Sequence, residues 1–158
     1  MRVILLDFDG TIIPFNSHKF DKQEKGMEGT PKFFSRIMAR IFAFDAGLYV
    51  SRGYFCTETI DKIYDCENKR ITLWSEKIRK KGVTVVLLTN NTNPFLKIYA
   101  QEKKWELRQP VSIFGFPMIR FHKRLWILYY RFNGIIVAHI NDDFREFYRG
   151  SKFNILVK

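Results

Sequence analysis

The sequence predicts an α/β fold in which helices alternate with the strands of a parallel sheet. Two runs of branched and apolar residues, 2–6 and 83–88, each stop abruptly at polar residues. Such runs are typical of strands buried on both faces of a parallel sheet. Apolar residues recur at helical spacing in the segments between and after them, which favours a doubly wound sheet. The chain of 158 residues suits one domain with a core of its own.

The net charge of +11 at pH 7 favours polyanionic or phosphorylated partners. The basic residues are spread along the whole chain, so a generally basic, solvated surface stays open as the alternative. The two cysteines, Cys56 and Cys66, form neither a disulfide framework nor a C-x-x-C metal site. We therefore expect a reduced, cytoplasmic protein. We expect no secretory leader and no transmembrane segment, because the apolar runs are short or interrupted by charges.

The first apolar run ends in two carboxylates, Asp7 and Asp9, within the sequence DFDGT. Ligands of open α/β sheets bind at the carboxyl ends of the strands, and Gly10 lets the backbone bend away without a side-chain clash. Two like charges this close are costly unless a cation relieves them, so the pair predicts a divalent metal site. The alternative is a strand that simply ends in a turn.

Residues 12–29 are polar and irregular, and a helix is predicted over 30–46, with Thr30 as its N-cap. Lys32, Arg36 and Arg40 form a basic stripe on that helix. The helix is either an ordinary core element with a solvated edge, or a lid over a site, or a surface for a membrane or a partner.

A second helix is predicted over 67–81, with Ile71, Trp74 and Ile78 on one face and Gly82 as its stop.

The second apolar run is followed by Thr89, Asn90 and Asn91. A hydroxyl at the end of a strand, followed by backbone N–H groups, can hold a phosphoryl oxygen. If the two runs are neighbouring parallel strands, Thr89 lies beside Asp7. The next helix is predicted to begin at Asn93-Pro94, with Phe95, Ile98 and Tyr99 facing inward.

A third, short strand is predicted over 111–116, and a helix over 121–133 that ends at Gly134. The helix is predicted from the spacing of four apolar residues: Leu125, Leu128, Tyr129 and Phe132. Near its beginning, Lys123 could supply the cation that balances two carboxylates and a phosphate. Its neighbours Arg120 and Arg124 are alternatives for that role.

A fourth strand is predicted over 135–140, and Asp142 and Asp143 follow it. The acidic pair could cap the short helix predicted over 144–149, or it could bind a metal. A fifth strand is predicted over 153–157.

These four clusters, in this order, resemble the four motifs of the haloacid dehalogenase (HAD) superfamily of phosphohydrolases. The motifs are an apolar strand ending in DxDGT, a strand ending in Thr, a lysine, and a strand ending in two adjacent acids. The resemblance covers roughly 1–15 and 83–158. It implies a three-layer α/β sandwich with a five-stranded parallel sheet in the order 5-4-1-2-3. It also implies one domain over 1–158, in which 16–66 forms a small helical cap or an elaborated flap.

The function that the resemblance implies is a Mg²⁺-dependent phosphatase that forms an aspartyl-phosphate. Asp7 would be the nucleophile, Asp9 the general acid and base, and Lys123 the site cation. The substrate would be contacted by Thr89, Asn90 and Gly10, and the metal would be bound by Asp7, Asp9, Asp142 and Asp143. The substrate would be a phosphorylated small molecule or a nucleic-acid end, with possible nucleic-acid contact through the basic surface. The alternative is a non-catalytic basic binding or interaction module on the same scaffold.

Overall fold

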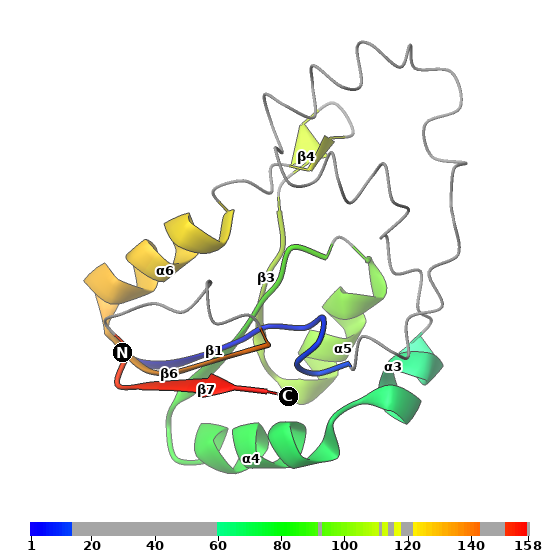
Figure 1. Ribbon diagram of the computed structural model, residues 1–158, viewed down its shortest axis with the longest axis horizontal. Coiled ribbons are helices and arrows are strands. Elements are labelled where there is room, and N and C mark those ends of the chain that lie inside the picture. The colour runs from blue at the N-terminus through cyan, green and yellow to red at the C-terminus, as the bar shows by residue number, and fades with distance from the viewer. Residues whose placement is uncertain are drawn as a thin grey trace.

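The computed structural model describes residues 1–13, 60–91, 93–110, 112–113, 116–117, 122–142 and 151–157. Its elements in chain order are β1 (Arg2–Leu6), α3 (Ile60–Cys66), α4 (Lys69–Arg79), β2 (Thr84–Leu88), α5 (Phe95–Lys103), β3 (Glu106–Arg108), β4 (Ser112–Ile113), β5 (Phe116–Pro117), α6 (His122–Asn133), β6 (Ile135–Asn141) and β7 (Phe153–Leu156) (Figure 1).

Five of the strands form one parallel sheet in the order β3-β2-β1-β6-β7. Numbered along the chain within this sheet, the order is 3-2-1-4-5, which is 5-4-1-2-3 read from the other edge. The predicted fold class, a three-layer α/β sandwich with a five-stranded parallel sheet in this order, is therefore confirmed. Leu6 pairs with Leu87 on one side and with Ile140 on the other. The carboxyl ends of the three central strands therefore meet at one edge.

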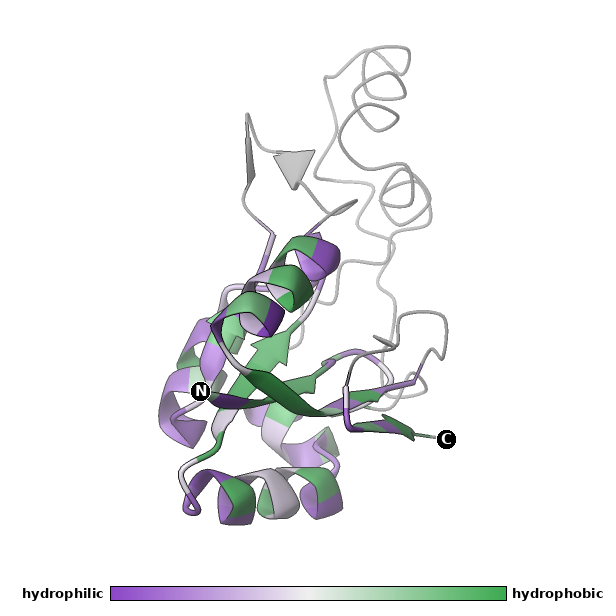
Figure 2. Ribbon diagram, turned by 90° about the vertical axis from the view of Figure 1, so that its left-hand side faces the viewer, coloured by the Kyte–Doolittle hydropathy of each residue, from purple (hydrophilic) through white to green (hydrophobic). Residues whose placement is uncertain are grey.

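The sheet separates two hydrophobic cores. Side chains alternate along β1, so that Val3 and Leu5 pack against Ile127 and Tyr130 of α6. The other face, with Ile4 and Leu6, is covered by α3, α4 and α5. Figure 1 shows α6 on one side of the sheet and α4 on the other. Figure 2 shows the central strands as largely hydrophobic, whereas the helices carry both hydrophobic and hydrophilic residues, as expected for a middle layer between two outer ones.

The strand predicted over 111–116 is wrong. The third strand of the sheet is β3, which starts earlier, and Ser112–Ile113 instead pairs antiparallel with Phe116–Pro117. The chain enters the sheet early because α5 ends at Lys103, and the left-handed backbone of its cap residue Lys104 (φ 56°) turns the chain back. Trp105 N then donates to Ala100 O at 2.8 Å, and the strand follows directly.

The helix predicted over 67–81 exists as α4, but the expected face is only partly right. Asn68 caps it, because its side chain accepts from Ile71 N. Trp74 is exposed, while the small side chains of Thr72 and Ser75 are buried. Small residues at this contact let the helix approach its neighbours closely.

The inward face predicted for the next helix is also partly wrong. In α5, Phe95 and Ile98 are exposed, and the buried residues are Leu96, Tyr99 and Ala100.

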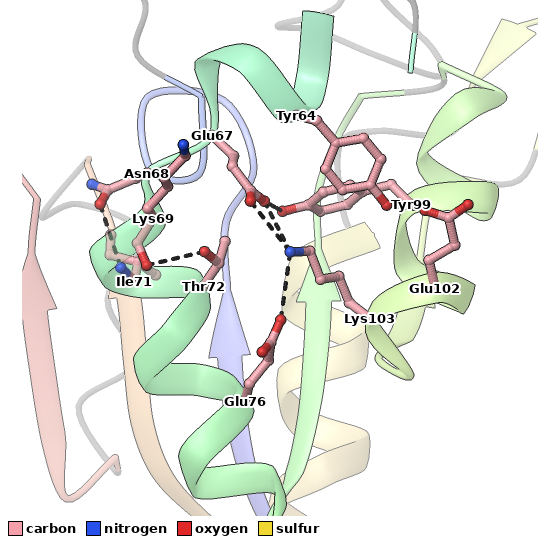
Figure 3. Close-up of polar contacts among 10 residues, drawn as sticks. All are labelled: Tyr64, Glu67, Asn68, Lys69, Ile71, Thr72, Glu76, Tyr99, Glu102 and Lys103. Carbon is pink, nitrogen blue, oxygen red and sulfur yellow. Dashed lines mark hydrogen bonds and ion pairs between the residues drawn. The ribbon is translucent and has the colours of Figure 1, made fainter. Parts of the chain in front are cut away.

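A cluster of polar residues ties α3, α4 and α5 together (Figure 3). Lys103 Nζ lies 3.2 and 3.3 Å from the two carboxylate oxygens of Glu67 and 3.4 Å from Glu76 Oε1. The Tyr99 hydroxyl donates to Glu67 Oε2 at 2.6 Å. The ammonium group also lies 5.4 Å from the ring centroid of Tyr64 and 5.6 Å from that of Tyr99, within the range of cation–π attraction. We call these five residues the Lys103 cluster.

Several predictions from the sequence lie outside the described residues. They are the helix over 30–46, the helix over 144–149 and Asp143. Of the predicted cap or flap over 16–66, the structure describes only α3, which the sequence did not predict. Among the helices that the structure describes, none has the length and apolar character needed to cross a membrane.

Candidate functional site

The candidate site lies at the carboxyl edge of the sheet, where Asp7, Thr89 and Asp142 each follow a central strand. Asp7 N donates to Ile140 O at 3.0 Å, which continues the ladder between β1 and β6 by one residue. Thr89 N donates to Arg108 O at 3.2 Å and continues the ladder between β2 and β3 in the same way. The sheet thus fixes the backbone of both residues before their side chains leave it.

Asp7 forms a buried ion pair with Lys123. Lys123 Nζ, on the first turn of α6, lies 3.0 Å from Asp7 Oδ2, and the two side chains are only 13% and 9% exposed. Phe8 N donates to the other carboxylate oxygen, Oδ1, at 2.9 Å. An opposite charge and an N–H donor both favour the ionised form of a carboxylate. Of the two alternative cations, Arg124 is exposed and Arg120 lies outside the described residues.

A tight turn brings Asp9 back over the edge of the sheet. Gly10 has a φ of 74°, a conformation that glycine adopts without strain. Gly10 N donates to Ile13 O at 2.7 Å, and Ile12 N and Ile13 N donate to Phe8 O. Asp9 is half-buried and points to the loop after β2, because Asn91 Nδ2 donates to Asp9 Oδ1 at 3.1 Å.

Asn91 organises the loop after β2, although sequence reasoning selected its neighbour Asn90. Its backbone N donates to Thr89 Oγ1 at 3.0 Å, and its Oδ1 accepts from Asn93 N at 2.9 Å. Gln109 Nε2 donates to the carbonyl oxygens of both Asn91 and Asn93, at 3.0 and 2.9 Å. The tendency of asparagine to accept from the backbone two residues later is visible in the sequence. The contact with Asp9 is not visible in the sequence, because it joins the loops that follow two different strands, β1 and β2.

Two buried oxygens near this edge have no hydrogen-bond partner among the described residues. They are Asn90 Oδ1 and Thr11 Oγ1. A buried polar atom without a partner costs about 1–3 kcal/mol, and such an atom at a ligand-binding edge is suited to gain its partner from a ligand. Thr89 is fully buried. Its hydroxyl accepts from Asn91 N and can itself donate to a phosphoryl oxygen.

His122, the first residue of α6, is a second residue that sequence reasoning missed. Its side chain is buried, and its Nε2 lies 3.0 Å from Arg108 O. The Thr89 backbone also hydrogen-bonds the ring. Because a carbonyl oxygen can only accept, Nε2 carries the hydrogen. Burial is the largest cause that lowers the pKa of His122 below its ordinary value of 6.5 and so favours the neutral ring.

The oxygen donors at this edge fit Mg²⁺. Asp7 and the half-buried Asp142 follow the neighbouring strands β1 and β6, and the carbonyl of Asp9 is close in sequence. Within the described part of the chain, no three His, Cys, Asp or Glu side chains group as a metal site. Mg²⁺ does not need three, because it is commonly bound by one or two carboxylates together with water and substrate phosphate.

No family model matches the sequence, and no curated protein matches it. Two solved structures are similar to this chain: a substrate-bound complex of phosphoserine phosphatase and a phosphoserine phosphatase in its apo form. Each has a TM-score of 0.46, and the sequence identities are 12% and 13%. Each match covers 89% of this chain and 77% of the other.

Proposed function

We propose that this protein is a Mg²⁺-dependent phosphatase that hydrolyses phosphomonoesters through an aspartyl-phosphate, the chemistry of the HAD superfamily that its motifs resemble. The observation that carries the proposal is the buried pair of Asp7 and Lys123, with Nζ 3.0 Å from Oδ2. The pair lies where open α/β sheets bind their ligands. A helix from one layer brings the cation to a carboxylate at the end of the central strand.

Asp7 is the nucleophile in this proposal. An oxygen of its carboxylate attacks phosphorus and forms the acyl-phosphate bond, while the alcohol leaves. Lys123 keeps the carboxylate ionised before the attack and then lies beside the phosphoryl oxygens. The Thr89 hydroxyl donates to one of those oxygens. Donors that are already in place when charge develops lower the barrier without reorganisation.

Asp9 is the general acid and base. It protonates the leaving oxygen, and then takes a proton from the water that hydrolyses the acyl-phosphate. The hydrogen bond from Asn91 to Oδ1 sets the orientation of the carboxyl group.

Mg²⁺ would be held by the carboxylates of Asp7 and Asp142 and by the carbonyl of Asp9, and Asp143 would be either a further ligand or a support for the others. When bound, the metal supplies positive charge next to the transferring phosphoryl group.

The substrate is a phosphorylated small molecule or a nucleic-acid end. The net charge of +11 supports an anionic substrate, because it attracts polyanions over distances beyond direct contact.

The test is metal-dependent turnover of an aryl phosphate by the purified chain, with Asp7→Asn as the diagnostic variant. The amide cannot act as nucleophile, so we expect a loss on the order of a thousandfold or more. Asp61→Asn is the matched control, because Asp61 is an exposed acid on α3, and it should keep full activity. Turnover that survives Asp7→Asn excludes the covalent mechanism. A wild-type chain inactive toward all phosphomonoesters tested favours the binding module instead.

A further inference from the structure

We infer that His122 is a positioning residue, which holds the first turn of α6 so that Lys123 reaches Asp7; this inference rests on the proposed function for its catalytic meaning. His122 and Lys123 are adjacent at the start of the same helix. One side chain is directed to the backbone at the ends of β2 and β3, and the other to the carboxylate at the end of β1.

The contacts of the ring explain how it can fix the helix. Nε2 lies 3.0 Å from Arg108 O, and the Thr89 backbone also hydrogen-bonds the ring. Both partners are main-chain groups at the edge of the sheet, and they are themselves joined, because Thr89 N donates to Arg108 O. The partners of the ring among the described residues are therefore main-chain groups of the sheet.

A second group of contacts, around the side chain of Arg108, holds the middle of α6 to β3. The guanidinium carbon of Arg108 lies 4.1 Å from the centroid of the Trp126 ring. Arg108 Nε donates to the Tyr130 hydroxyl at 2.9 Å, and that hydroxyl donates to Glu106 Oε2 at 2.7 Å. The helix thus has two separate attachments to β3. Loss of the first affects the turn that carries Lys123, while the second keeps the helix in place.

Two substitutions, His122→Leu and Tyr130→Phe, test the two attachments one at a time. His122→Leu removes the first, and we expect it to lower kcat about 10- to 100-fold, as loss of a group that orients a reacting side chain does. His122→Gln keeps an N–H donor at a similar reach and should restore most of the loss. Tyr130→Phe removes a hydroxyl from the second attachment and should leave kcat within twofold. A His122→Leu enzyme with wild-type kcat, or one that Gln does not rescue, overturns the inference.

A double-mutant cycle shows whether His122 acts through Lys123. In a Lys123→Met background, His122→Leu should cause no further loss of kcat, because the side chain that it positions is already gone. If His122 had a merely structural role, the fold losses of kcat in the two single variants would multiply in the double variant. Multiplying losses therefore overturn the inference.

A second measurement does not depend on turnover. The coupling between Asp7 and Lys123 is obtained from the denaturant midpoints of Asp7→Asn, Lys123→Met and the double variant. We expect this coupling to fall by more than half when the cycle is repeated with His122→Leu, and to remain when it is repeated with Tyr130→Phe. An unchanged coupling overturns the inference, even if the wild-type chain has no phosphatase activity. Absence of that activity with a reduced coupling overturns only the proposed function.

Discussion

The described part of the protein contains two buried lysine–carboxylate pairs that have almost the same distance and burial. Lys123 lies 3.0 Å from Asp7, with side chains 13% and 9% exposed, and Lys103 lies 3.2 Å from Glu67, with side chains 14% and 9% exposed. Distance and burial do not distinguish them. What differs is where in the fold each pair lies and which groups surround it.

The Lys103 pair lies within a layer of helices. Its ammonium also contacts Glu76 and the faces of two tyrosine rings, and the Tyr99 hydroxyl donates to the Glu67 carboxylate. These groups come from α3, α4, α5 and the link between α3 and α4, so the cluster joins helices. The Lys123 pair lies at the carboxyl edge of the sheet, where Thr89, Asp9 and two buried oxygens without a hydrogen-bond partner among the described residues also lie.

The comparison shows that a buried ion pair is not by itself evidence of a site. Buried pairs pay a desolvation cost that their attraction only partly returns, so they are weak evidence of stability and equally weak evidence of catalysis. The Lys123 pair differs by its position at the strand ends, and this position is the basis of the function proposed for it. Exchanging the lysines for methionine tests this distinction.

The largest expected difference is in turnover. Lys123→Met removes a donor aimed at the developing phosphoryl charge, and we expect kcat to fall about 100- to 1000-fold. Lys103→Met should leave kcat within a few fold, because none of the described groups that the Lys103 ammonium contacts belongs to the proposed catalytic machinery. Steady-state kinetics on an aryl phosphate measure both. Equal losses of kcat in the two variants would show that the position of the Lys123 pair gives it no special role in turnover.

A smaller difference is expected in stability. Each methionine leaves a buried carboxylate without its cation, and each should lower the free energy of unfolding by about 3 kcal/mol in EDTA. Mg²⁺ should then stabilise Lys123→Met more than Lys103→Met, because a metal that neutralises Asp7 no longer meets a competing ammonium. Urea unfolding with and without Mg²⁺ measures this. Equal gains from Mg²⁺ in both variants would contradict the metal assignment at Asp7.

The sequence predicted the sheet because the signal for its central strands is local. Residues 2–6 and 83–88 are nearly continuous apolar runs, and a strand buried on both faces produces this pattern. The edge strand β3 was missed because it has three residues, one of them apolar, and is held by pairing with β2 rather than by burial.

The helix α6 shows a different limit of sequence reasoning. The apolar stripe that predicts it is exposed in the structure: Leu125 63%, Leu128 42%, Tyr129 47% and Phe132 84%. Periodicity gave the helix correctly but not its buried face. That face includes His122 and Tyr130, whose polar groups are satisfied by partners on β3. A pattern of hydrophobicity alone cannot identify such residues as buried.

The candidate site shows the same limit, because some of its residues could be predicted from the sequence and others could not. Asp7, Asp9, Thr89 and Lys123 each belong to a short motif with its own signal, and the structure brings Asp7 to Lys123 directly. Asn91 and His122 have roles only through their contacts with other strands, so a single sequence cannot reveal them.

The smallest expected effect is on stability, because the two regions should make the free energy of unfolding depend on pH in opposite ways. Burial, the largest cause, lowers the pKa of His122 below its ordinary 6.5. The unfolded state therefore binds more protons than the folded state in acid, so stability is complete above pH 6.5 and falls as the pH drops through the folded pKa. Burial, followed by the hydrogen bond with Glu67, raises the pKa of Tyr99 well above its ordinary 10.0. Here stability is complete below pH 10 and falls as the pH rises.

Each of these groups changes the free energy of unfolding by at most about 1.4 kcal/mol per pH unit. His122→Gln should flatten the acid side of the stability profile and leave the alkaline side unchanged, and Tyr99→Phe should do the reverse. Urea unfolding at pH 5.5, 7.5 and 10.5, chosen on either side of the two ordinary pKa values, gives the slopes. The differences from wild type remove the contribution of every other titrating group, including the buried His139. If either variant changes the opposite side, the two regions are energetically coupled, and the separation drawn between them is wrong.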